Sequence, residues 1–498
     1  MSHAAILSRA STGLEAPLVT VEAHLSNGLP AFSVVGLPES SVREARERVR
    51  SALLCSHFSW PDRRITVSLA PAELPKAGGR FDLPIALAIL VASGQLPGRV
   101  SEQGEFAGEL GLDGSLRQCN GLLAAVRAAT HAGRPLFVPQ NQAGQLARVP
   151  NSHVIGATDL LTVCGLVKSE HLPEPTPPGA APVSTSNRSK APIAGQALAK
   201  RALTVAAAGG HHLLMIGPPG AGKTLLASKL PTLLGEPSEQ EALDLDLIRD
   251  TLGLDAEAGR PFRSPHHSIS AAGLVGGGAR ALPGEVSLAH GGVLFLDELP
   301  EFRPQVLELL RQPLEEGQMT ITRLNSKNCY PARFQLLAAM NPCPCGQSGT
   351  EEDRCRCTPA TVERYQHRIS GPLLDRIDLH IRLERLSAAT LLREKPSEPP
   401  SPHGSTTQAI AHARKVQFAR QGTPNAQLAG DKVMEACRLD PLVKEWLQTA
   451  CDRLELSGRG IHKALRVART LADLAGEDTV GEAALLESLS YRPWQQKR

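Results

Sequence analysis

The stretch of sequence that decides the fold reads Gly217-Pro218-Pro219-Gly220-Ala221-Gly222-Lys223-Thr224. It matches the phosphate-loop pattern G-x-x-x-x-G-K-[ST] at every specified position, and it lies between the apolar run Leu213–Ile216 and a stretch of helical pattern. Glycines let backbone N–H groups curl around a β-phosphate, helped by the helix N-terminus. We therefore predict that these eight residues bind ATP, with Lys223 bridging the β- and γ-phosphates and Thr224 ligating Mg²⁺.

Two further segments carry polar groups that ATP hydrolysis needs. Val293–Leu296 is a continuous apolar run, as expected of a buried parallel strand, and Asp297 and Glu298 follow it. Because α/β sheets place their chemistry at the carboxyl ends of strands, we predict that Asp297 holds the Mg²⁺ water shell and that Glu298 orients or deprotonates the attacking water. A third apolar run, 334–340, ends in Asn341. Its amide is suited to position that water, although Asn341 taken alone is better explained as a turn residue before proline.

The composition of the chain excludes several classes of protein. It has 498 residues, of which 42% are hydrophobic, which is enough for packed cores in two or three domains and too many for a wholly disordered chain. The 53 basic and 50 acidic residues give a net charge of +3, which argues neither for nor against nucleic acid. Ten cysteines are too sparse for a disulfide scaffold. Without a secretory pattern, and with a longest apolar run (83–92) about half of a bilayer span, we expect a cytoplasmic protein with no membrane partner.

Two proline-rich stretches divide the chain. Residues 169–192 and 395–407 combine proline with small and polar residues, a composition typical of exposed linkers. They leave three predicted domains. In 1–168 strand and helix patterns alternate, 193–394 contains the phosphate loop, and 408–498 is helical in pattern. We therefore predict an α/β protein with a parallel sheet in the central domain and a helical C-terminal domain.

Four cysteines lie close together in the central domain. Cys343-x-Cys345 and Cys355-x-Cys357 are separated by nine residues. Four thiolates can hold Zn²⁺ tetrahedrally, and four thiols in so polar a loop are rarely part of a core. We therefore predict a structural zinc site within 343–357. Because C-x-C is a less diagnostic spacing than C-x₂-C, unliganded reduced thiols are the alternative.

Longer phrases around these motifs resemble a known family. Phe-Arg-Ser-Pro-His-His at 262–267 and Pro-Gly-Glu-Val-Ser-Leu-Ala-His-Gly-Gly-Val-Leu-Phe-Leu-Asp-Glu-Leu-Pro-Glu-Phe at 283–302 are similar to the magnesium-chelatase-like AAA+ ATPases, and more closely to their YifB/ComM branch. Leu-Ala-Pro-Ala-Glu-Leu-Pro-Lys at 69–76 and Leu-Arg-Val-Ala-Arg-Thr-Leu-Ala-Asp-Leu at 465–474 resemble the same branch. The resemblance therefore extends over almost the whole chain.

The resemblance implies a fold and an assembly. In this family a Lon-protease-like (ribosomal S5 domain 2-type) α/β domain precedes a P-loop AAA+ core and a C-terminal helical lid, and the chains form rings, most often hexamers. The family's Leu-Leu-Asp-Arg motif stands here at 373–376, which implies that Arg376 is an arginine finger reaching a neighbouring subunit's γ-phosphate. A plain Asp–Arg surface pair is the alternative. The sensor-2 arginine matches Arg459 best, with Arg466 as the second candidate.

The N-terminal domain lacks the groups of a Lon-type protease. Such an enzyme needs a serine nucleophile and a lysine base. Where the resemblance places them, this chain has Arg80 and Ala125. We therefore interpret 1–168 as a non-proteolytic binding or assembly module.

Two signals outside these motifs are weaker. His266 and His267 are better explained as hydrogen-bonding side chains near the nucleotide or a subunit contact than as metal ligands. In the expected hairpin 318–333, Arg323 and Lys327 are candidates for contacts to DNA phosphates, but a solvated hairpin is equally consistent with the pattern.

Three functions are compatible with such an ATPase. The resemblance implies a homo-oligomeric motor that acts on branched or single-stranded DNA and drives branch migration of joint molecules during natural transformation. The first alternative is a chelatase-type motor that remodels a protein partner for metal insertion. The second is an ATP-dependent protease, which Arg80 and Ala125 disfavour.

Overall fold

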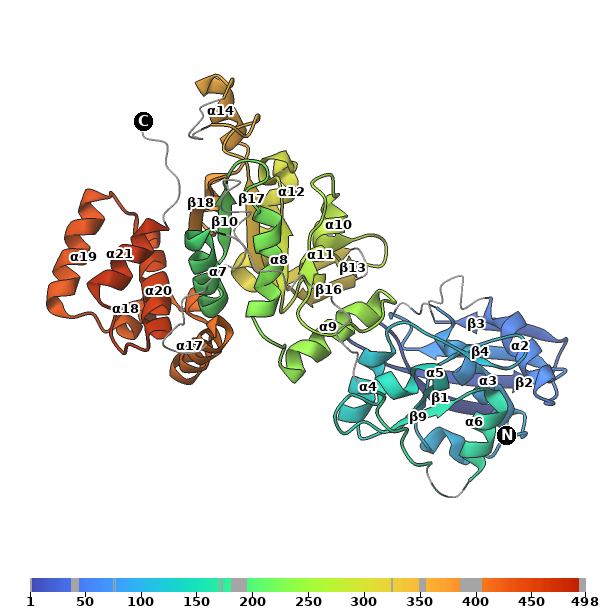
Figure 1. The fold of residues 1–498 in the computed structure, drawn as a ribbon. Coiled ribbons are helices and arrows are strands. Elements are labelled where there is room, and N and C mark those ends of the chain that lie inside the picture. The colour runs from blue at the N-terminus through green and yellow to red at the C-terminus, as the bar shows by residue number, and fades with distance from the viewer. Residues whose placement is uncertain are drawn as a thin grey trace. The chain divides into compact units, whose positions relative to one another are not determined.

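The computed structural model describes residues 2–36, 44–74, 76, 78–169, 171, 173–180, 195–323, 326–348, 355–385 and 405–491. The chain forms two compact units, each described here by itself (Figure 1). Unit 1 comprises Met1–Val183, Leu243–Ala258 and Thr320–Tyr330, and unit 2 comprises Ser184–Ala242, Gly259–Met319 and Pro331–Arg498. Most of the two predicted linkers lies outside the described residues. None of the described helices combines the length and the apolar content that a bilayer crossing requires.

A seven-stranded sheet organises unit 1. Its order is β3-β4-β2-β1-β5-β8-β9, with β2 antiparallel to both β1 and β4 and the other neighbours parallel. Alternate residues of β2 are buried, as expected of a strand with one face on a core. The strands are β1 (His3–Arg9), β2 (Leu18–Ser26), β3 (Ala31–Val35), β4 (Arg64–Ala70), β5 (Glu105–Phe106), β8 (Leu136–Pro139) and β9 (Val154–Ala157), with β6 (Glu109–Leu110) and β7 (Leu116–Arg117) pairing separately.

The helices of unit 1 pack on this sheet. All eleven residues of α3 (Asp82–Ala92) are buried, which its nearly uniform apolar sequence predicts, and the helix contacts β1 and β2. Its neighbours in the core include Val19, Val49 and Ile65. The remaining helices are α2 (Ala45–Cys55), α4 (Leu122–His131), α5 (Gln140–Leu146) and α6 (Leu160–Lys168), with short 3₁₀ turns η1 (Gly79–Phe81) and η2 (Gly98–Glu102).

Two segments of the predicted central domain pack in unit 1 instead. One holds most of α9 (Glu239–Thr251), whose Leu247 is buried in one core with Leu122 and Leu123. The other holds most of the hairpin of β15 (Gln318–Arg323) and β16 (Ser326–Pro331). The described part of the first predicted linker also contacts unit 1, since Thr176 N donates to Val154 O at 2.7 Å. Sequence composition cannot reveal the packing of α9, because its apolar partners Leu122 and Leu123 lie more than 100 residues away from Leu247.

Unit 2 is built on a five-stranded parallel sheet in the order β11-β14-β17-β10-β18. The three central strands are buried at every position, as their apolar sequences predict, and the one polar residue among them is Gln335 at the start of β17. The strands are β10 (Leu213–Ile216), β11 (Phe262–Arg263), β14 (Val293–Leu296), β17 (Gln335–Met340) and β18 (Leu379–Arg382), with β12 (Gly276–Gly277) and β13 (Leu282–Pro283) paired separately. Since β17 lies between β14 and β10, the carboxyl ends of the three predicted strands meet at one edge.

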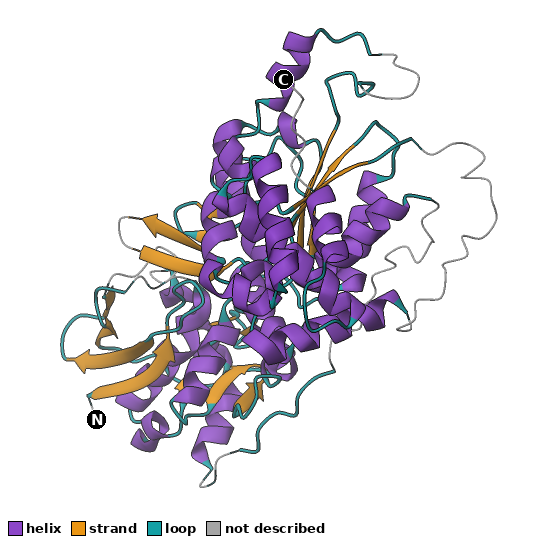
Figure 2. Ribbon diagram, turned by 90° about the vertical axis from the view of Figure 1, so that its left-hand side faces the viewer, coloured by secondary structure: helices purple, strands orange, loops and turns teal. Residues whose placement is uncertain are grey.

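Helices surround this sheet, and within the described residues 405–491 they form all the regular structure that follows β18 (Figure 2). The first group is α7 (Ala197–Gly209), α8 (Lys223–Leu233), α10 (Ala271–Val275), α11 (Glu285–Leu288), α12 (Pro304–Glu308), α13 (Arg311–Glu316), α14 (Pro359–Gln366) and α15 (Gly371–Leu374), with η3 (Leu299–Glu301). The C-terminal group is α17 (Thr406–Gln421), α18 (Gly430–Cys437), α19 (Pro441–Arg453), α20 (Gly458–Ala475) and α21 (Glu482–Ser490), with η4 (Asn425–Gln427). Helix α20 contacts α7 and α21, and its buried Asp473 accepts hydrogen bonds from Arg420 and Asn425. The predicted α/β fold with a parallel sheet and a helical C-terminal region is confirmed.

Candidate functional site

The phosphate loop connects β10 to the first residue of α8. Gly220 and Gly222 have φ values of +79° and +86°, which L side chains rarely adopt, and a Cβ at either position would meet nothing within 4 Å. Gly217 is needed for a different reason, because a Cβ there would lie 2.8 Å from Leu383 Cβ. The glycines therefore set the curvature of the loop while its outer side stays open.

The ammonium of Lys223 is held at the centre of this loop. Its Nζ donates to Gly217 O at 2.6 Å, to Pro218 O at 3.2 Å and to Asn341 Oδ1 at 2.9 Å. Burial lowers the pKa of Lys223, while the nearby Asp297 and Glu298 raise it. The cation is thus positioned by the loop itself and by the residue that follows β17.

The acidic residues after β14 lie beside the start of α8. Thr224 Oγ1 donates to Asp297 Oδ2 at 2.9 Å, and Asp297 Oδ1 accepts from Glu298 N at 2.9 Å. A hydroxyl and a carboxylate at this separation are hard oxygen ligands of the kind that Mg²⁺ prefers. The structure therefore brings together the predicted residues Lys223, Thr224, Asp297 and Asn341.

Glu298 has an unusual backbone and a partner that the sequence did not identify. Its φ is +53°, a left-handed conformation that costs free energy in a residue with a side chain and is often found at functional positions. Its Oε2 lies 3.3 Å from Nδ1 of His267. The parallel pairing of β11 with β14 makes this contact possible, because it sets the loop after Arg263 beside the loop after Leu296. His267 thus lies close to a carboxylate that follows β14, a contact that only the sheet pairing reveals.

The two predicted arginines lie together, in a different place. A pocket of about 660 Å³ is lined by both Arg376 and Arg459, and also by Lys463 and Arg466. Arg376 forms an ion pair with Glu315 and donates to Pro372 O at 2.5 Å. Burial lowers the pKa of Arg376, and the neighbouring Arg459 lowers it further. The residues lining this pocket do not include any of the phosphate loop.

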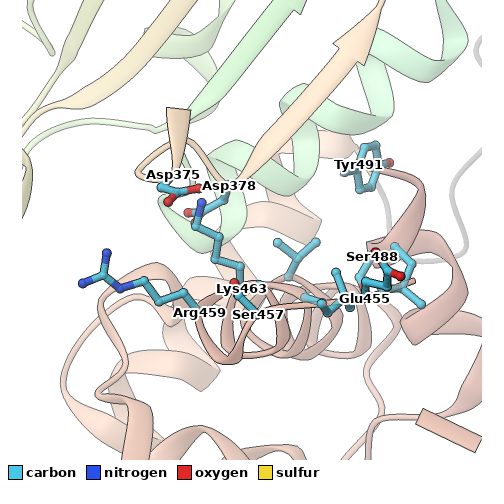
Figure 3. A pocket seen from close by; sticks show the side chains of 13 residues that line it. Asp375, Asp378, Glu455, Ser457, Arg459, Lys463, Ser488 and Tyr491 are labelled. Atoms are coloured by element: carbon cyan, nitrogen blue, oxygen red, sulfur yellow. The ribbon is translucent and has the colours of Figure 1, made fainter. Parts of the chain in front are cut away.

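A smaller pocket, of about 200 Å³, adjoins the first (Figure 3). In it Lys463 extends from α20 toward Asp375 and Asp378, whereas Arg459 points away. Burial lowers the pKa of Lys463, and the two aspartates raise it. Lys463 is therefore engaged with the loop before β18, which leaves Arg459 as the outward-facing cation of this helix start. The sensor-2 role of Arg459 stays a prediction.

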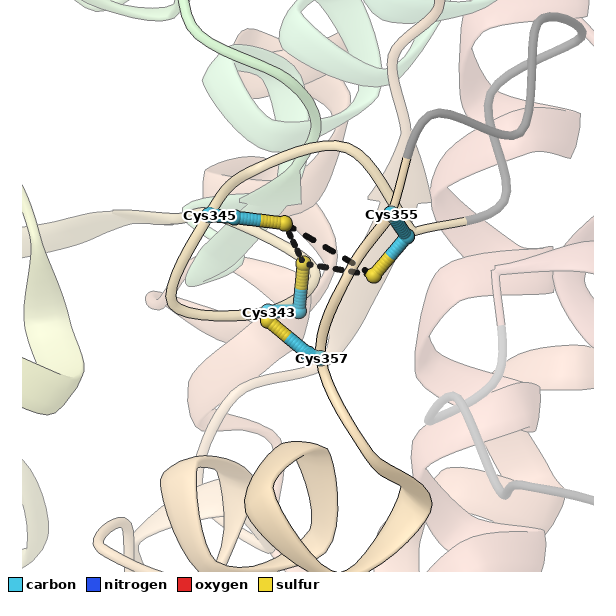
Figure 4. A group of neighbouring side chains, drawn as sticks. All are labelled: Cys343, Cys345, Cys355 and Cys357. Carbon is cyan, nitrogen blue, oxygen red and sulfur yellow. Dashed lines mark hydrogen bonds between the residues drawn. The ribbon is translucent and has the colours of Figure 1, made fainter.

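The four clustered cysteines are brought together as predicted (Figure 4). Their sulfur atoms all lie within 4.8 Å of one another, although Cys343 is buried and Cys345 is exposed. Cys343 Sγ lies 3.3 Å from Cys345 Sγ and 3.7 Å from Cys355 Sγ. We call Cys343, Cys345, Cys355 and Cys357 the thiol cluster.

The residues at the Lon-type positions are buried. Arg80 is 6% exposed and donates to Asn120 O, and Ala125, a residue of α4, is fully buried in the core. Burial lowers the pKa of Arg80, while Cys119 and Asp250 raise it. Neither position presents a nucleophile or a base to a substrate. In the hairpin of β15 and β16, Arg323 and Lys327 are exposed, and their contact with DNA stays a prediction.

Comparison with known proteins shows which families and which individual proteins the chain is similar to. Three family models match the chain: "Magnesium chelatase, subunit ChlI" at residues 190–391, "Subunit ChlI of Mg-chelatase" at 21–142, and "Magnesium chelatase, subunit ChlI C-terminal" at 403–492. Competence protein ComM from Haemophilus influenzae is 46% identical over 99% of this chain and 98% of its own length. The uncharacterized protein YifB from Escherichia coli is 42% identical over 99% of this chain and 97% of its own. Lon protease 2 from Bacillus subtilis is 29% identical over 30% of this chain and 32% of its own.

Proposed function

Because the chain belongs to the YifB/ComM family of magnesium-chelatase-like AAA+ ATPases, we propose that it is an ATP-hydrolysing ring motor that acts on DNA and drives branch migration of joint molecules during natural transformation. The observation that carries the ATPase part is the contact network of Lys223, Thr224, Asp297 and Asn341. The DNA part rests on similarity, over nearly the whole length of both chains, to a protein named for competence.

The site fits ATP and Mg²⁺. The loop N–H groups and the N-terminus of α8 would bind phosphate oxygens. Lys223 Nζ would release a carbonyl oxygen of the loop and bind the phosphates instead. Thr224 and Asp297 would hold Mg²⁺, directly or through water, since their oxygens are already 2.9 Å apart. The ion supplies charge stabilisation at the β- and γ-phosphates.

Glu298 and Asn341 act on the attacking water in this proposal. Glu298 accepts its proton or orients it, and His267 holds the carboxylate at 3.3 Å, toward the edge of the sheet. Asn341 is coupled to phosphate binding because its Oδ1 accepts a hydrogen bond from Lys223. A shift of Lys223 toward phosphate would free the Asn341 amide for the water.

A ring explains where Arg376 and Arg459 lie. Both line a pocket whose lining includes no phosphate-loop residue, which supports the proposal that they serve the site of an adjacent subunit rather than their own. An arginine that completes a neighbour's site stabilises charge on the transferring phosphoryl group and couples hydrolysis around the ring. Hexamers are the expected form.

A second candidate is a chelatase-type motor that remodels a protein partner. It is favoured by the three family models, each described as a magnesium-chelatase subunit. The two candidates differ in what stimulates them, because a DNA motor responds to DNA and a protein remodeller does not.

The test is the ATPase rate of the full chain without DNA and with single-stranded, duplex or four-way-junction DNA, together with strand exchange on the junction. We expect stimulation by branched or single-stranded DNA, ATP-dependent movement of the junction, and a steep loss of DNA binding with salt. Glu298→Gln is the control, because it should bind ATP and DNA without moving the junction. An ATPase indifferent to every form of DNA would favour the chelatase-type motor.

A further inference from the structure

The geometry of the thiol cluster is that of a closed metal site. In a tetrahedral site with Zn–S bonds of about 2.3 Å, neighbouring sulfurs are about 3.8 Å apart. The pairs Cys343–Cys355 and Cys345–Cys355 are 3.7 Å and 3.6 Å apart, and all four sulfurs lie within 4.8 Å. The turn that holds Cys343 and Cys345 and the segment that holds Cys355 and Cys357 bring their sulfurs together from two sides (Figure 4). All four cysteines are free, so no disulfide accounts for their approach.

The cluster begins three residues after the end of β17. Asn341 follows β17 directly and binds Lys223, and Cys343 comes after one further residue, a proline. Ser348 N donates to Cys343 Sγ at 3.3 Å, and Gly346 N donates to Cys343 O at 2.9 Å. Amide hydrogen bonds to a thiolate and a tight turn around it are typical of the surroundings of metal-bound sulfur.

The chain between the two cysteine pairs closely approaches the phosphate loop. Gly346 lies between the two cysteine pairs with φ +76°, and a Cβ on it would be 2.6 Å from Pro219 Cδ and 3.8 Å from Asn341 Cγ. Glycine is therefore required both for the turn and for the close approach to the loop. On the other side, Gln366 Nε2 donates to Pro342 O at 2.9 Å, which joins α14 to the same short connection.

We propose that the thiol cluster binds one Zn²⁺ and that this metal site braces Asn341 and the phosphate loop, so that metal loading sets the affinity of the chain for ATP. The ATP part rests on the proposed function, and the metal part does not. In this proposal, loss of the metal removes the support for the close approach of Gly346 to Pro219. Four thiolates with no carboxylate or imidazole select zinc or iron over Mg²⁺.

The metal is tested directly on the full chain purified without chelator. We expect elemental analysis to find about one zinc per chain. Replacement by Co²⁺ should give the ligand-to-metal absorption of cobalt thiolate. The variant Cys345→Ser/Cys357→Ser should lose the metal, whereas Cys55→Ser, at an exposed cysteine of unit 1, should retain it. Wild-type protein that contains no metal and takes up neither zinc nor cobalt would overturn the proposal, and iron in place of zinc would overturn the choice of ion.

The coupling is tested by ATP affinity, measured by calorimetry on zinc-loaded, zinc-stripped and zinc-restored protein. We expect the Kd for ATP to rise by about tenfold on stripping, which is the size of one lost hydrogen bond to a charged group, and to recover with zinc but not with extra Mg²⁺. Equal affinity in the stripped and loaded forms would overturn the coupling. Zinc-loaded protein that does not bind ATP would refute the proposed function and leave the metal site supported.

A variant that keeps all four sulfurs separates coupling from misfolding. Gly346→Ala should retain zinc and weaken ATP binding, because its Cβ presses on Pro219. Gly422→Ala is the matched control, since Gly422 also has a positive φ (+74°) but would place its Cβ in open space. Equal ATP affinity in the two variants, with zinc present in both, would contradict the contact as the route of coupling.

Discussion

The phosphate loop and the loop around Arg80 are both glycine-containing turns that enter a helix, yet one is open and the other is filled. A Cβ on Gly220 or Gly222 would meet nothing within 4 Å. A Cβ on Gly79 would meet Glu109 Oε2 at 2.3 Å, and one on Gly121 would lie 3.1 Å from Arg80 Nη2. Glycine followed by a helix therefore does not make a binding site. The space beyond the turn decides whether a ligand can enter.

The filled site is occupied by the chain itself. Asp250 of α9 accepts a hydrogen bond from Leu123 N at 2.7 Å, and its backbone carbonyl accepts from Gly121 N at 3.1 Å. Burial raises the pKa of Asp250, while the hydrogen bonds and Arg80 lower it. A segment from the middle of the sequence thus binds the N-terminus of α4, the helix that carries Ala125. These hydrogen bonds join residues 243–258 to the N-terminal part of unit 1.

The largest expected effect tests whether the open site is shared between subunits. Arg376→Ala should bind ATP but lose about 10³–10⁵-fold in turnover, because charge on the transferring phosphoryl group is no longer stabilised. Mixing it with Lys223→Ala should restore part of the turnover, since the second variant supplies an intact Arg376 to the first. ATPase rates across a titration of the two proteins measure this. A single Arg376→Ala protein with wild-type turnover would remove the basis for a shared site.

The next largest effect concerns Glu298, the residue that we propose activates the attacking water in the open site. Glu298→Gln should lower turnover by about 10²–10⁴-fold while ATP affinity stays near the wild-type value, because the amide cannot take a proton. Single-turnover hydrolysis and equilibrium ATP binding separate the two quantities. Glu301→Gln, at a neighbouring acidic residue of η3, is the control and should keep normal turnover. If Glu298→Gln hydrolyses ATP normally, another residue is the base.

A smaller effect is expected in the filled site. Asp250→Ala should destabilise unit 1 by about 1–3 kcal/mol, because it removes the acceptor of the Leu123 N–H. Faster amide hydrogen exchange at 119–125 and a lower unfolding temperature would show it. Glu239→Ala, at the exposed start of the same helix, should change stability by less than about 0.5 kcal/mol. Equal behaviour of the two variants would mean that the α9 contact contributes nothing to the fold.

The smallest expected effect is an absence of peptide hydrolysis, which tests whether the site around Arg80 is filled. Arg80→Ser places a hydroxyl where the resemblance puts the nucleophile, but Ala125 still provides no base and the site stays buried. We expect no peptide or casein hydrolysis above the Arg80→Ala background. Serine-dependent cleavage in Arg80→Ser would show that the filled site opens in solution.

The sequence by itself determined the features that depend on short stretches of chain. Local spacing and apolar runs predicted three of these features: the eight residues of the phosphate loop, the buried strands before Asp297 and Asn341, and the helical C-terminal region. These patterns are informative because hydrogen bonding and burial constrain a strand or helix residue by residue. The two C-x-C pairs likewise predicted a cluster, because four thiols in so polar a loop are rarely part of a core.

Only the tertiary structure decided which of these features meet. The strand order β14-β17-β10 brings Asn341 into contact with Lys223, and the pairing of β11 with β14 brings His267 close to Glu298. The turn at Gly346 brings the chain beside the thiol cluster close to the phosphate loop. The packing of Leu247 likewise assigned part of α9 to unit 1, across the predicted domain boundary. Each contact joins residues whose separation along the chain carries no information about distance. It forms because burying the apolar faces of whole elements leaves few arrangements, and the polar groups at their ends come together as a consequence.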